Sequence, residues 1–276
     1  MDVSSDSSWP VWSHTCGLDD LVAPYVIDDQ VAERLTTGEG WSRRWSAVWK
    51  CTDADVICSV RELSSVPTAV TVPVRRFVWR AGQRHRPGLK YMLGTERMHG
   101  FESLAERRLL LALDFVGAVG EVLSQPFRLR FLSKDGKGEH IPDFLLLSGG
   151  GGWLLDVRPR HLVKERDVLK FAAARQAAEA VGWRYSVVTG WRREVMTGVE
   201  TLSARRRPLS DPMALHSQVR QCVKKRPHRL LELVEATTVP AVARVHVVHL
   251  LWHRLLAVDL ARPLGDGSWI YPAGRA

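Results

Sequence analysis

Three carboxylates and one arginine in the middle of the chain have the types and spacing of a hydrolytic site. Asp143 opens one apolar run of residues, and Asp156 and Arg158 stand two apart at the end of the next run. Side chains two apart on a strand share a face, so Asp156 and Arg158 are expected to point the same way. Glu106 belongs to an earlier amphipathic segment, from which it can join them.

Carboxylates gathered at one point repel one another unless a cation lies among them. Their hard oxygen ligands suit Mg²⁺, with Mn²⁺ as an alternative, and such an ion can activate water and stabilise a phosphoryl transition state. The pattern therefore favours phosphodiester hydrolysis, with Asp143, Asp156 and Glu106 as metal ligands and with these three and Arg158 as catalytic residues. Taken singly, the residues also suit a turn, a helix cap and a surface ion pair.

The neighbouring sequence predicts the elements that must position these side chains. Ser103 and Glu106 form a capping-box pattern ahead of a helix of about four turns. The segments that follow read as a strand, a hairpin turn, a second strand, a glycine turn, a third strand, a helix and a fourth strand, over residues 127–131, 134–138, 141–147, 149–152, 153–158, 164–181 and 183–189. We expect both aspartates to lie on the sheet face that the first helix covers.

The positive charge of the chain is concentrated in two segments. The net charge is +9, but residues 1–70 carry −6, residues 71–100 carry +6 and residues 190–229 carry +7. Such clusters are typical of a surface that meets a polyanion, although a solvated basic surface is the alternative. The candidate DNA-binding residues are Arg75, Arg76, Arg80, Arg84, Arg86, Lys170, Arg205, Arg206 and Arg207. Residues 75–100 have no clear period and are expected to form an extended loop, which Phe77 and Trp79 pin to the domain.

Composition and patterning divide the chain into four parts. Residues 1–70 are an acidic, tryptophan-rich region of unknown role, in which 28–35 reads as a helix, 54–60 as a strand and the tryptophans as core. Residues 71–192 are the core with its basic N-terminal loop, 193–226 a basic connector, and 227–276 a winged-helix-like module that binds DNA or a partner. On a helix of this last module, His246, His249 and His253 stand at helical spacing, and we expect them to form a polar face in preference to a metal site.

Several classes of protein are disfavoured by the sequence. No apolar run approaches the roughly 18 residues that span a bilayer, and the first residues lack the pattern of a secretory signal. The four cysteines include no C-x-x-C pair, which argues against a zinc ribbon and favours reduced thiols. We therefore expect a cytoplasmic protein, associated with the nucleoid when assembled on DNA, with no membrane partner.

The combined motifs resemble the PD-(D/E)xK restriction-endonuclease-like fold, an α/β fold with a mixed sheet and flanking helices. Within it, residues 75–190 resemble the TnsA-like endonuclease subunits of heteromeric transposases. The resemblance rests on Arg80-Ala81-Gly82-Gln83-Arg84-His85, Phe101-Glu102-Ser103-Leu104-Ala105-Glu106-Arg107, Leu113-Asp114-Phe115, Gln125-Pro126-Phe127, His140-Ile141-Pro142-Asp143-Phe144, Asp156-Val157-Arg158-Pro159 and Gly182-Trp183. It implies an enzyme that cuts one strand at each transposon end, beside a DDE-type transposase and an AAA+ regulator, with Glu102, Gln125 and His140 as accessory residues.

One position departs from the family pattern, because the motif usually ends in lysine and this chain has Arg158. Arginine cannot give up its proton at ordinary pH, so we expect it to orient water or hold the scissile phosphate while the cation activates the nucleophile. Two other functions stay open: a stand-alone nuclease of restriction or repair type, and a DNA-binding scaffold whose active site has lapsed.

Overall fold

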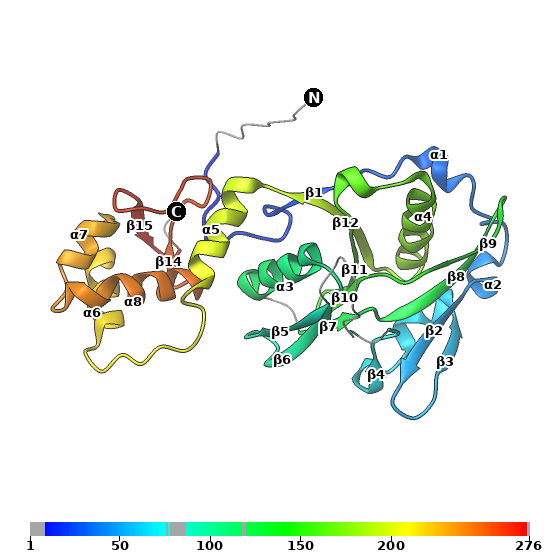
Figure 1. The fold of residues 1–276 in the computed structure, drawn as a ribbon, viewed down its shortest axis with the longest axis horizontal. Coiled ribbons are helices and arrows are strands. Elements are labelled where there is room, and N and C mark those ends of the chain that lie inside the picture. The colour runs from blue at the N-terminus through cyan, green and yellow to red at the C-terminus, as the bar shows by residue number, and fades with distance from the viewer. Residues whose placement is uncertain (1–8, 76, 78–86, 118–119, 275–276) are drawn as a thin grey trace. The chain divides into compact units, whose positions relative to one another are not determined.

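The structure, a computed structural model, describes residues 9–75, 77, 87–117 and 120–274, and it is a mixed α/β protein with several sheets (Figure 1). The chain divides into two compact units. The catalytic-candidate unit, called unit 2, comprises Ala23–Leu110 and Gly117–Gly190, and unit 1 comprises Met1–Val22, Leu111–Val116 and Trp191–Ala276. This division replaces the predicted boundary at residue 70, because residues 23–70 contribute strands to the same unit as the candidate site.

The first sheet of unit 2 has the order β1-β12-β11-β10-β7. Its strands are β1 (Val22–Pro24), β7 (Glu121–Ser124), β10 (Phe144–Ser148), β11 (Gly151–Val157) and β12 (Arg184–Trp191). Strand β10 pairs antiparallel with β7 and β11, whereas β12 runs parallel to β11. A parallel pair requires a crossover, and helix α4 (Glu165–Glu179) supplies it. The predicted helix and the strands around Asp143 and Asp156 are thus present, and β7 is an additional strand.

The second sheet has the order β3-β2-β8-β9, with β4 also paired to β2. Its strands are β2 (Ser46–Cys51), β3 (Val56–Ser59), β4 (Thr71–Val72), β8 (Phe127–Ser133) and β9 (Gly136–His140). Residues 127–131 were expected to be the first strand of the candidate-site sheet. That expectation was wrong, because β8 pairs with β2 and β9, and β7 takes the position beside β10.

Helix α4 joins the two sheets through a common core. It packs against β11 and against β9, and its alanine-rich face lets the backbone approach both strands closely. Trp45 and Trp49 are fully buried in this core, where Trp49 packs on the ring of Phe127 at 4.8 Å between centroids. The interpretation of the tryptophans as core is confirmed for these two, whereas Trp9 is largely exposed.

A hairpin corrects the predicted loop at residues 75–100. Strands β5 (Gly88–Met92) and β6 (Arg97–Phe101) pair antiparallel; alternate residues of β5 are buried, and so are the last three residues of β6. The ring of Phe77 packs directly over Gly100, so close that a Cβ at position 100 would collide with it. This contact agrees with the expectation that Phe77 pins the segment to the domain. Trp79 lies outside the described residues.

Short elements complete unit 2. They are the helices α1 (Asp29–Ala32) and α2 (Trp41–Arg44) and the 3₁₀ turns Val60–Ser65, Thr68–Val70 and Arg160–Leu162. Asp28 caps α1 by accepting the N–H of Gln30, as the predicted capped helix requires. Helix α3 (Leu104–Val116) begins in unit 2, and its last turns belong to unit 1.

Unit 1 contains helices and one small sheet. The helices are α5 (Arg193–Ser203), α6 (Leu215–Lys225), α7 (Leu230–Glu235) and α8 (Pro240–Trp252), and the strands are β13 (His228–Arg229), β14 (Leu256–Ala257) and β15 (Trp269–Pro272), in the order β13-β15-β14. The predicted connector 193–226 is therefore largely helical, because apolar residues at helical spacing are buried beneath its charges. The predicted polar histidine face is also wrong, since His246 and His249 are buried.

No helix within the described ranges is long and apolar enough to cross a lipid bilayer. All four cysteines are free thiols, as the sequence predicts. Burial raises the pKa of the Cys16 thiol to about 12, so this side chain is an inert member of the core.

Candidate functional site

Glu106 is fixed at the first turn of α3 by a reciprocal set of hydrogen bonds. Its N–H donates to the Ser103 hydroxyl oxygen (3.2 Å), and its carboxylate accepts the N–H of Glu102 (2.7 Å) and the hydroxyl of Ser103 (2.7 Å). The Ser103 half of the predicted capping box therefore forms, while the Glu106 carboxylate accepts the N–H of Glu102 in place of that of Ser103. These bonds hold the buried Glu106 side chain in one orientation.

Asp143 lies immediately before β10 and links three segments. Its N–H donates to the carbonyl of Leu155 (3.1 Å), and its Oδ2 accepts the N–H of Val157 (2.7 Å). Its own carbonyl accepts the N–H of Gln125 (2.7 Å). Asp143 is thus tied to the last residues of β11, which also carry Asp156.

Asp156 is almost completely buried near the end of β11. His140 Nε2 lies 2.9 and 3.0 Å from its two oxygens, and the hydroxyl of Tyr185 donates to Oδ2 at 2.5 Å. Strand alternation sets Asp156 on the same face as Leu154, which belongs to the core beneath α4. The expectation that it lies on the face of the first helix was wrong, because the right-handed crossover brings α4 over that face.

Arg158 follows the end of β11 and is partly engaged by the fold. Its Nε donates to the carbonyl of Leu162 (3.2 Å), and its guanidinium lies 3.4 Å from Asp167 in the first turn of α4. The side chain remains 39% exposed, which leaves part of the guanidinium open to solvent.

These four residues line one cleft of about 470 Å³ in unit 2. The cleft has both signs of charge on its walls, which is the composition that a metal and a phosphate together require. Its full lining is Arg75, Glu102, Glu106, Arg128, Glu139, His140, Ile141, Asp143, Asp156, Val157, Arg158, Asp167, Lys170 and Phe171.

Two carboxyl groups of the cleft have raised pKa values. Burial, followed by the charges of Glu106 and Asp156, raises the pKa of Asp143 well above its ordinary value. Burial also raises the pKa of Glu106, against the hydrogen bonds from Glu102 and Ser103 that lower it. A divalent cation would relieve both effects, because it offsets the repulsion and compensates the lost hydration.

The three carboxylates of the cleft are not gathered in a closed cage of ligand atoms. Among the described residues, Glu106, Asp143 and Asp156 do not form a group whose ligand atoms all lie within 4.8 Å of one another. Mg²⁺ commonly keeps several waters and takes only one or two carboxylates together with phosphate oxygens.

The accessory residues and the basic residues have different positions. Glu102 and His140 line the cleft, but Gln125 does not, and its buried Oε1 has no hydrogen-bond partner within the described residues. Arg75 and Lys170 line the cleft, and Arg75 pairs with Glu102 at 3.4 Å. The remaining predicted arginines of the basic loop, Arg76, Arg80, Arg84 and Arg86, lie outside the described residues.

The arginines of the second basic segment belong to unit 1. Arg205 and Arg207 are exposed. Arg206 is instead directed inward, with its Nε 3.7 Å from the buried carboxylate of Asp114. It therefore stabilises the unit and is a poor candidate for DNA contact, although the sequence grouped it with its neighbours.

Sequence reasoning missed Tyr185 and Asp167. Tyr185 lies on β12, and only the parallel register of β12 with β11 brings its hydroxyl to Asp156. Asp167 has a local signal, because its side chain accepts the N–H of Lys164 as a capping residue of α4, but its ion pair with Arg158 depends on the fold.

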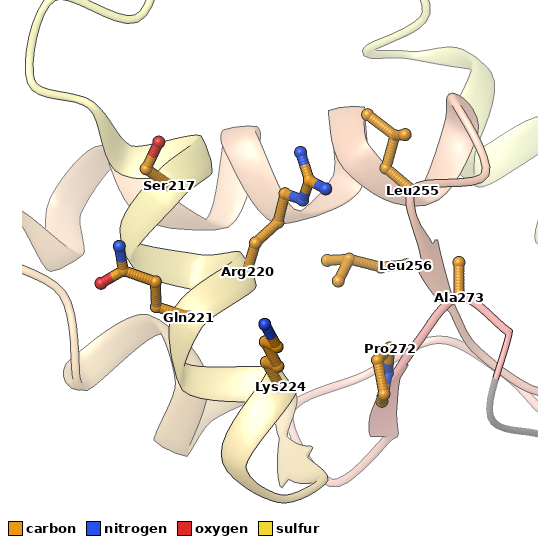
Figure 2. A pocket seen from close by; sticks show the side chains of 8 residues that line it. All are labelled: Ser217, Arg220, Gln221, Lys224, Leu255, Leu256, Pro272 and Ala273. Carbon is orange, nitrogen blue, oxygen red and sulfur yellow. The ribbon is translucent and has the colours of Figure 1, made fainter.

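Unit 1 has a separate basic pocket of about 500 Å³ beside α6 (Figure 2). Arg220 and Lys224 project from α6 into it, with Ser217 and Gln221 on the same helix, and Leu255, Leu256, Pro272 and Ala273 form the opposite wall. The pocket combines cationic groups with an apolar wall, which suits an anionic partner.

Comparison with protein-family models gives no match, and comparison with curated protein sequences gives none either. The assignment of a function therefore depends on the geometry of the cleft and on the resemblance of the motifs.

Proposed function

We propose that the chain is a Mg²⁺-dependent DNA endonuclease that hydrolyses one strand at each transposon end, as the TnsA-like subunit of a heteromeric transposase. The observation that carries the proposal is the cleft of unit 2, in which Asp143, Asp156, Glu106 and Arg158 meet although they come from different elements. Asp143 and Asp156 would hold the cation, with Glu106 beside them.

The connectivity around the cleft supports a restriction-endonuclease-like core. Helix α3 is followed by β7, β10 and β11 as antiparallel strands, then by α4 and the parallel strand β12. The predicted order of helix, three strands, helix and strand had residues 127–131 as its first strand; β7 takes that position, and the hairpin β8–β9 follows it.

The side chains of the cleft have separable roles in this proposal. When bound, Mg²⁺ supplies positive charge against the scissile phosphate and lowers the pKa of water. Arg75 and Arg158 bind and orient the phosphate, because a guanidinium donates in a planar fork. Lys170 also lines the cleft and adds a positive charge that can contact the DNA backbone.

The order of elements in unit 1 supports a winged-helix-like module. The succession α6, β13, α7, α8, β14 and β15 gives three helices and a three-stranded sheet with β15 in the middle. Helix α8 is too buried to read base edges, since His246, Val247, Leu250 and Leu251 all belong to the core. We therefore assign DNA-backbone or partner contact to the basic face of α6, through Arg220 and Lys224.

One observation favours a second function, that of a DNA-binding scaffold with a lapsed active site. The Asp156 carboxylate is hydrogen-bonded to His140 and Tyr185. The Arg158 guanidinium donates to the carbonyl of Leu162 and forms an ion pair with Asp167. If these contacts persist on DNA, neither group is available for hydrolysis.

A plasmid-cleavage assay with three conditions separates the functions. Strand-specific nicking at a transposon end that needs Mg²⁺ and the partner DDE-type transposase, with or without the AAA+ regulator, supports the proposal. Nicking by the purified chain alone identifies a stand-alone nuclease. If Asp143→Ala leaves cleavage and excision unchanged while DNA binding persists, the chain acts as a scaffold.

A further inference from the structure

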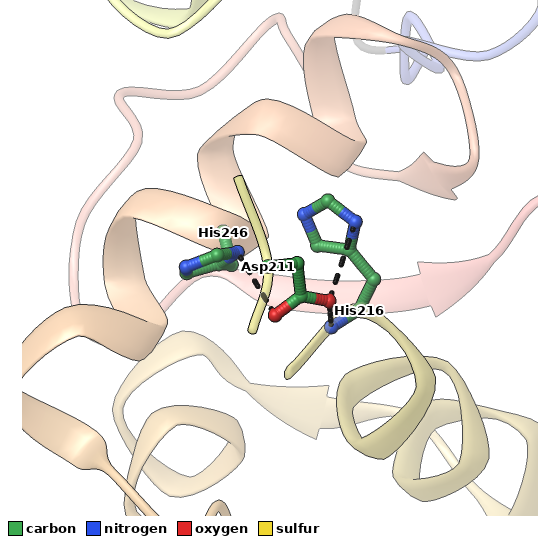
Figure 3. Close-up of side chains that lie close together, drawn as sticks. All are labelled: Asp211, His216 and His246. Carbon is green, nitrogen blue, oxygen red and sulfur yellow. Dashed lines mark hydrogen bonds and ion pairs between the residues drawn. The ribbon is translucent and has the colours of Figure 1, made fainter. Parts of the chain in front are cut away.

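Unit 1 contains a second cluster of metal-ligating side chains, far in sequence from the carboxylates of the cleft. Asp211 lies in the segment between α5 and α6, His216 on α6 and His246 on α8. Their potential ligand atoms all lie within 4.8 Å of one another (Figure 3). No other group of three histidine, cysteine or acidic residues meets that criterion in the described part of the chain.

The geometry inside the cluster is close to that of a coordination sphere. His216 Nδ1 is 3.6 Å from Asp211 Oδ2, and His246 Nδ1 is 3.8 Å from Asp211 Oδ1 (Figure 3). Ligands about 2.0 Å from a tetrahedral Zn²⁺ are roughly 3.3 Å apart. A small contraction would therefore bring both imidazoles and the carboxylate to one ion.

An unpartnered buried nitrogen is the independent observation that points to a ligand. The His246 side chain is only 7% exposed, and its Nδ1, which faces Asp211, has no hydrogen-bond partner within the described residues. The Nε2 of His216 is likewise buried and without a hydrogen bond there. Leaving a buried nitrogen unsatisfied is unfavourable, and coordination would remove that penalty for His246.

The carboxylate of Asp211 is held in place by α6. Its Oδ1 accepts the N–H of Leu215 (2.7 Å) and its Oδ2 the N–H of His216 (2.9 Å). Each carboxylate oxygen has further lone pairs, so these bonds orient the group without exhausting it. Oriented ligands of this kind are characteristic of metal sites.

A neighbouring histidine extends the cluster. His249 stacks on the ring of His216 at 5.3 Å and 9° between planes, and its Nδ1 donates to the carbonyl of Arg205 at 2.8 Å. A carbonyl can only accept, so Nδ1 of His249 carries the proton of that bond. The surroundings of the site are thus rich in imidazole nitrogen.

We propose that Asp211, His216 and His246 bind a divalent transition metal, with Zn²⁺ as the ion that two imidazoles and one carboxylate suit best. The ion ties the segment before α6 to α6 and α8, and a water completes its coordination. The proposal is independent of the function assigned to the cleft, whose oxygen ligands favour the harder Mg²⁺.

The test uses the full chain carrying Asp143→Asn, so that the cleft carboxylates do not compete for the ion. After treatment with a chelator, Zn²⁺ is titrated by calorimetry, and Co²⁺ is titrated by its visible absorption, which is strong for a tetrahedral nitrogen-containing site and weak for an octahedral oxygen site. We expect one ion per chain and a Zn²⁺-dependent rise in the melting temperature.

Matched variants locate the site. His246→Asn and His216→Asn are expected to weaken Zn²⁺ binding by at least about 100-fold, since even outer-shell changes cost 10–100-fold. His253→Asn, an exposed member of the same histidine row, should bind as the parent does. Asp211→Asn keeps one of the two oxygens that accept helix N–H groups and removes the charge of the carboxylate.

Two results would overturn the proposal. One is a Co²⁺ spectrum without the tetrahedral absorption, and the other is unchanged Zn²⁺ affinity in both His246→Asn and Asp211→Asn. Far-ultraviolet circular dichroism of each variant verifies that the helices are retained, so that lost binding is assigned to the ligand.

Discussion

Replacing Asp143 by asparagine is expected to stabilise the metal-free protein while removing its response to Mg²⁺. The carboxylate is surrounded by Glu106 and Asp156 and is raised in pKa mainly by burial. Asparagine keeps an oxygen that can accept the Val157 N–H, so the link between β10 and β11 persists. The variant loses the charge and little else.

Two opposing contributions set how much Asp143→Asn changes the free energy of unfolding. A charge-assisted hydrogen bond becomes a neutral one, which costs about 1 kcal/mol. Removing an unpaired buried charge recovers a penalty of several kcal/mol, part of which the wild type already avoids by protonation. A net gain of roughly 1–2 kcal/mol in the free energy of unfolding is typical, or about 2–8 °C in melting temperature for a unit of this size.

The sign of the pH dependence provides a check. A carboxyl whose pKa is raised in the folded protein favours folding when protonated, and this advantage is lost as the pH rises towards the folded pKa. Wild type and Asp143→Asn should therefore converge below an ordinary carboxyl pKa of about 3.9 and diverge as the pH rises above it.

Thermal unfolding in a chelator and in Mg²⁺ measures both effects. Mg²⁺ at about tenfold its dissociation constant should stabilise the wild type by about 1.4 kcal/mol and the variant by much less. Asp53→Asn is the control, because it removes an exposed turn carboxylate. The reasoning is refuted if Asp143→Asn is no more stable than wild type at neutral pH in chelator, or if Mg²⁺ stabilises both equally.

Three further predictions follow from named contacts. Lys170→Met should weaken DNA binding for all sequences and reduce its salt slope by about 1, because it removes a positive charge from the cleft lining; a salt slope equal to that of wild type would exclude a phosphate contact by Lys170. Arg220→Ala and Lys224→Ala should each weaken DNA binding for all sequences and reduce the salt slope by about 1, and an unchanged slope in a fluorescence titration argues against a phosphate contact by α6. Trp49→Ala should cost about 3–5 kcal/mol in urea unfolding, because the fully buried indole packs on Phe127, and a loss below about 1 kcal/mol would contradict that packing.

The local part of the candidate site could be predicted because its signals are local. The S-x-x-E pattern at Ser103 and Glu106 specifies a helix start, and the apolar runs ending at Asp156 specify strands. The two-residue spacing of Asp156 and Arg158 then fixes a shared side. All of these depend on residues within one or two turns of each other.

The parts that failed depend on pairings that no local pattern encodes. The alternation in Phe127–Phe131 predicts a strand, but it is silent about whether that strand pairs with β2 or with β10. The prediction that Asp156 faces the first helix failed because the helix that covers each face of the sheet is determined by the crossover after β11, not by the local sequence. The burial of His246 could not be predicted because it depends on packing against α6. The buried apolar residues of α6 are separated in the sequence by basic residues, so the sequence predicts a basic connector there.

The most direct test of the central claim is cleavage of supercoiled DNA carrying a transposon end, with the partner transposase present, by wild type, Asp143→Asn and Asp53→Asn. The account predicts Mg²⁺-dependent nicking by wild type and Asp53→Asn at similar rates, and loss of nicking in Asp143→Asn with DNA binding retained. Nicking by Asp143→Asn at the wild-type rate would contradict it.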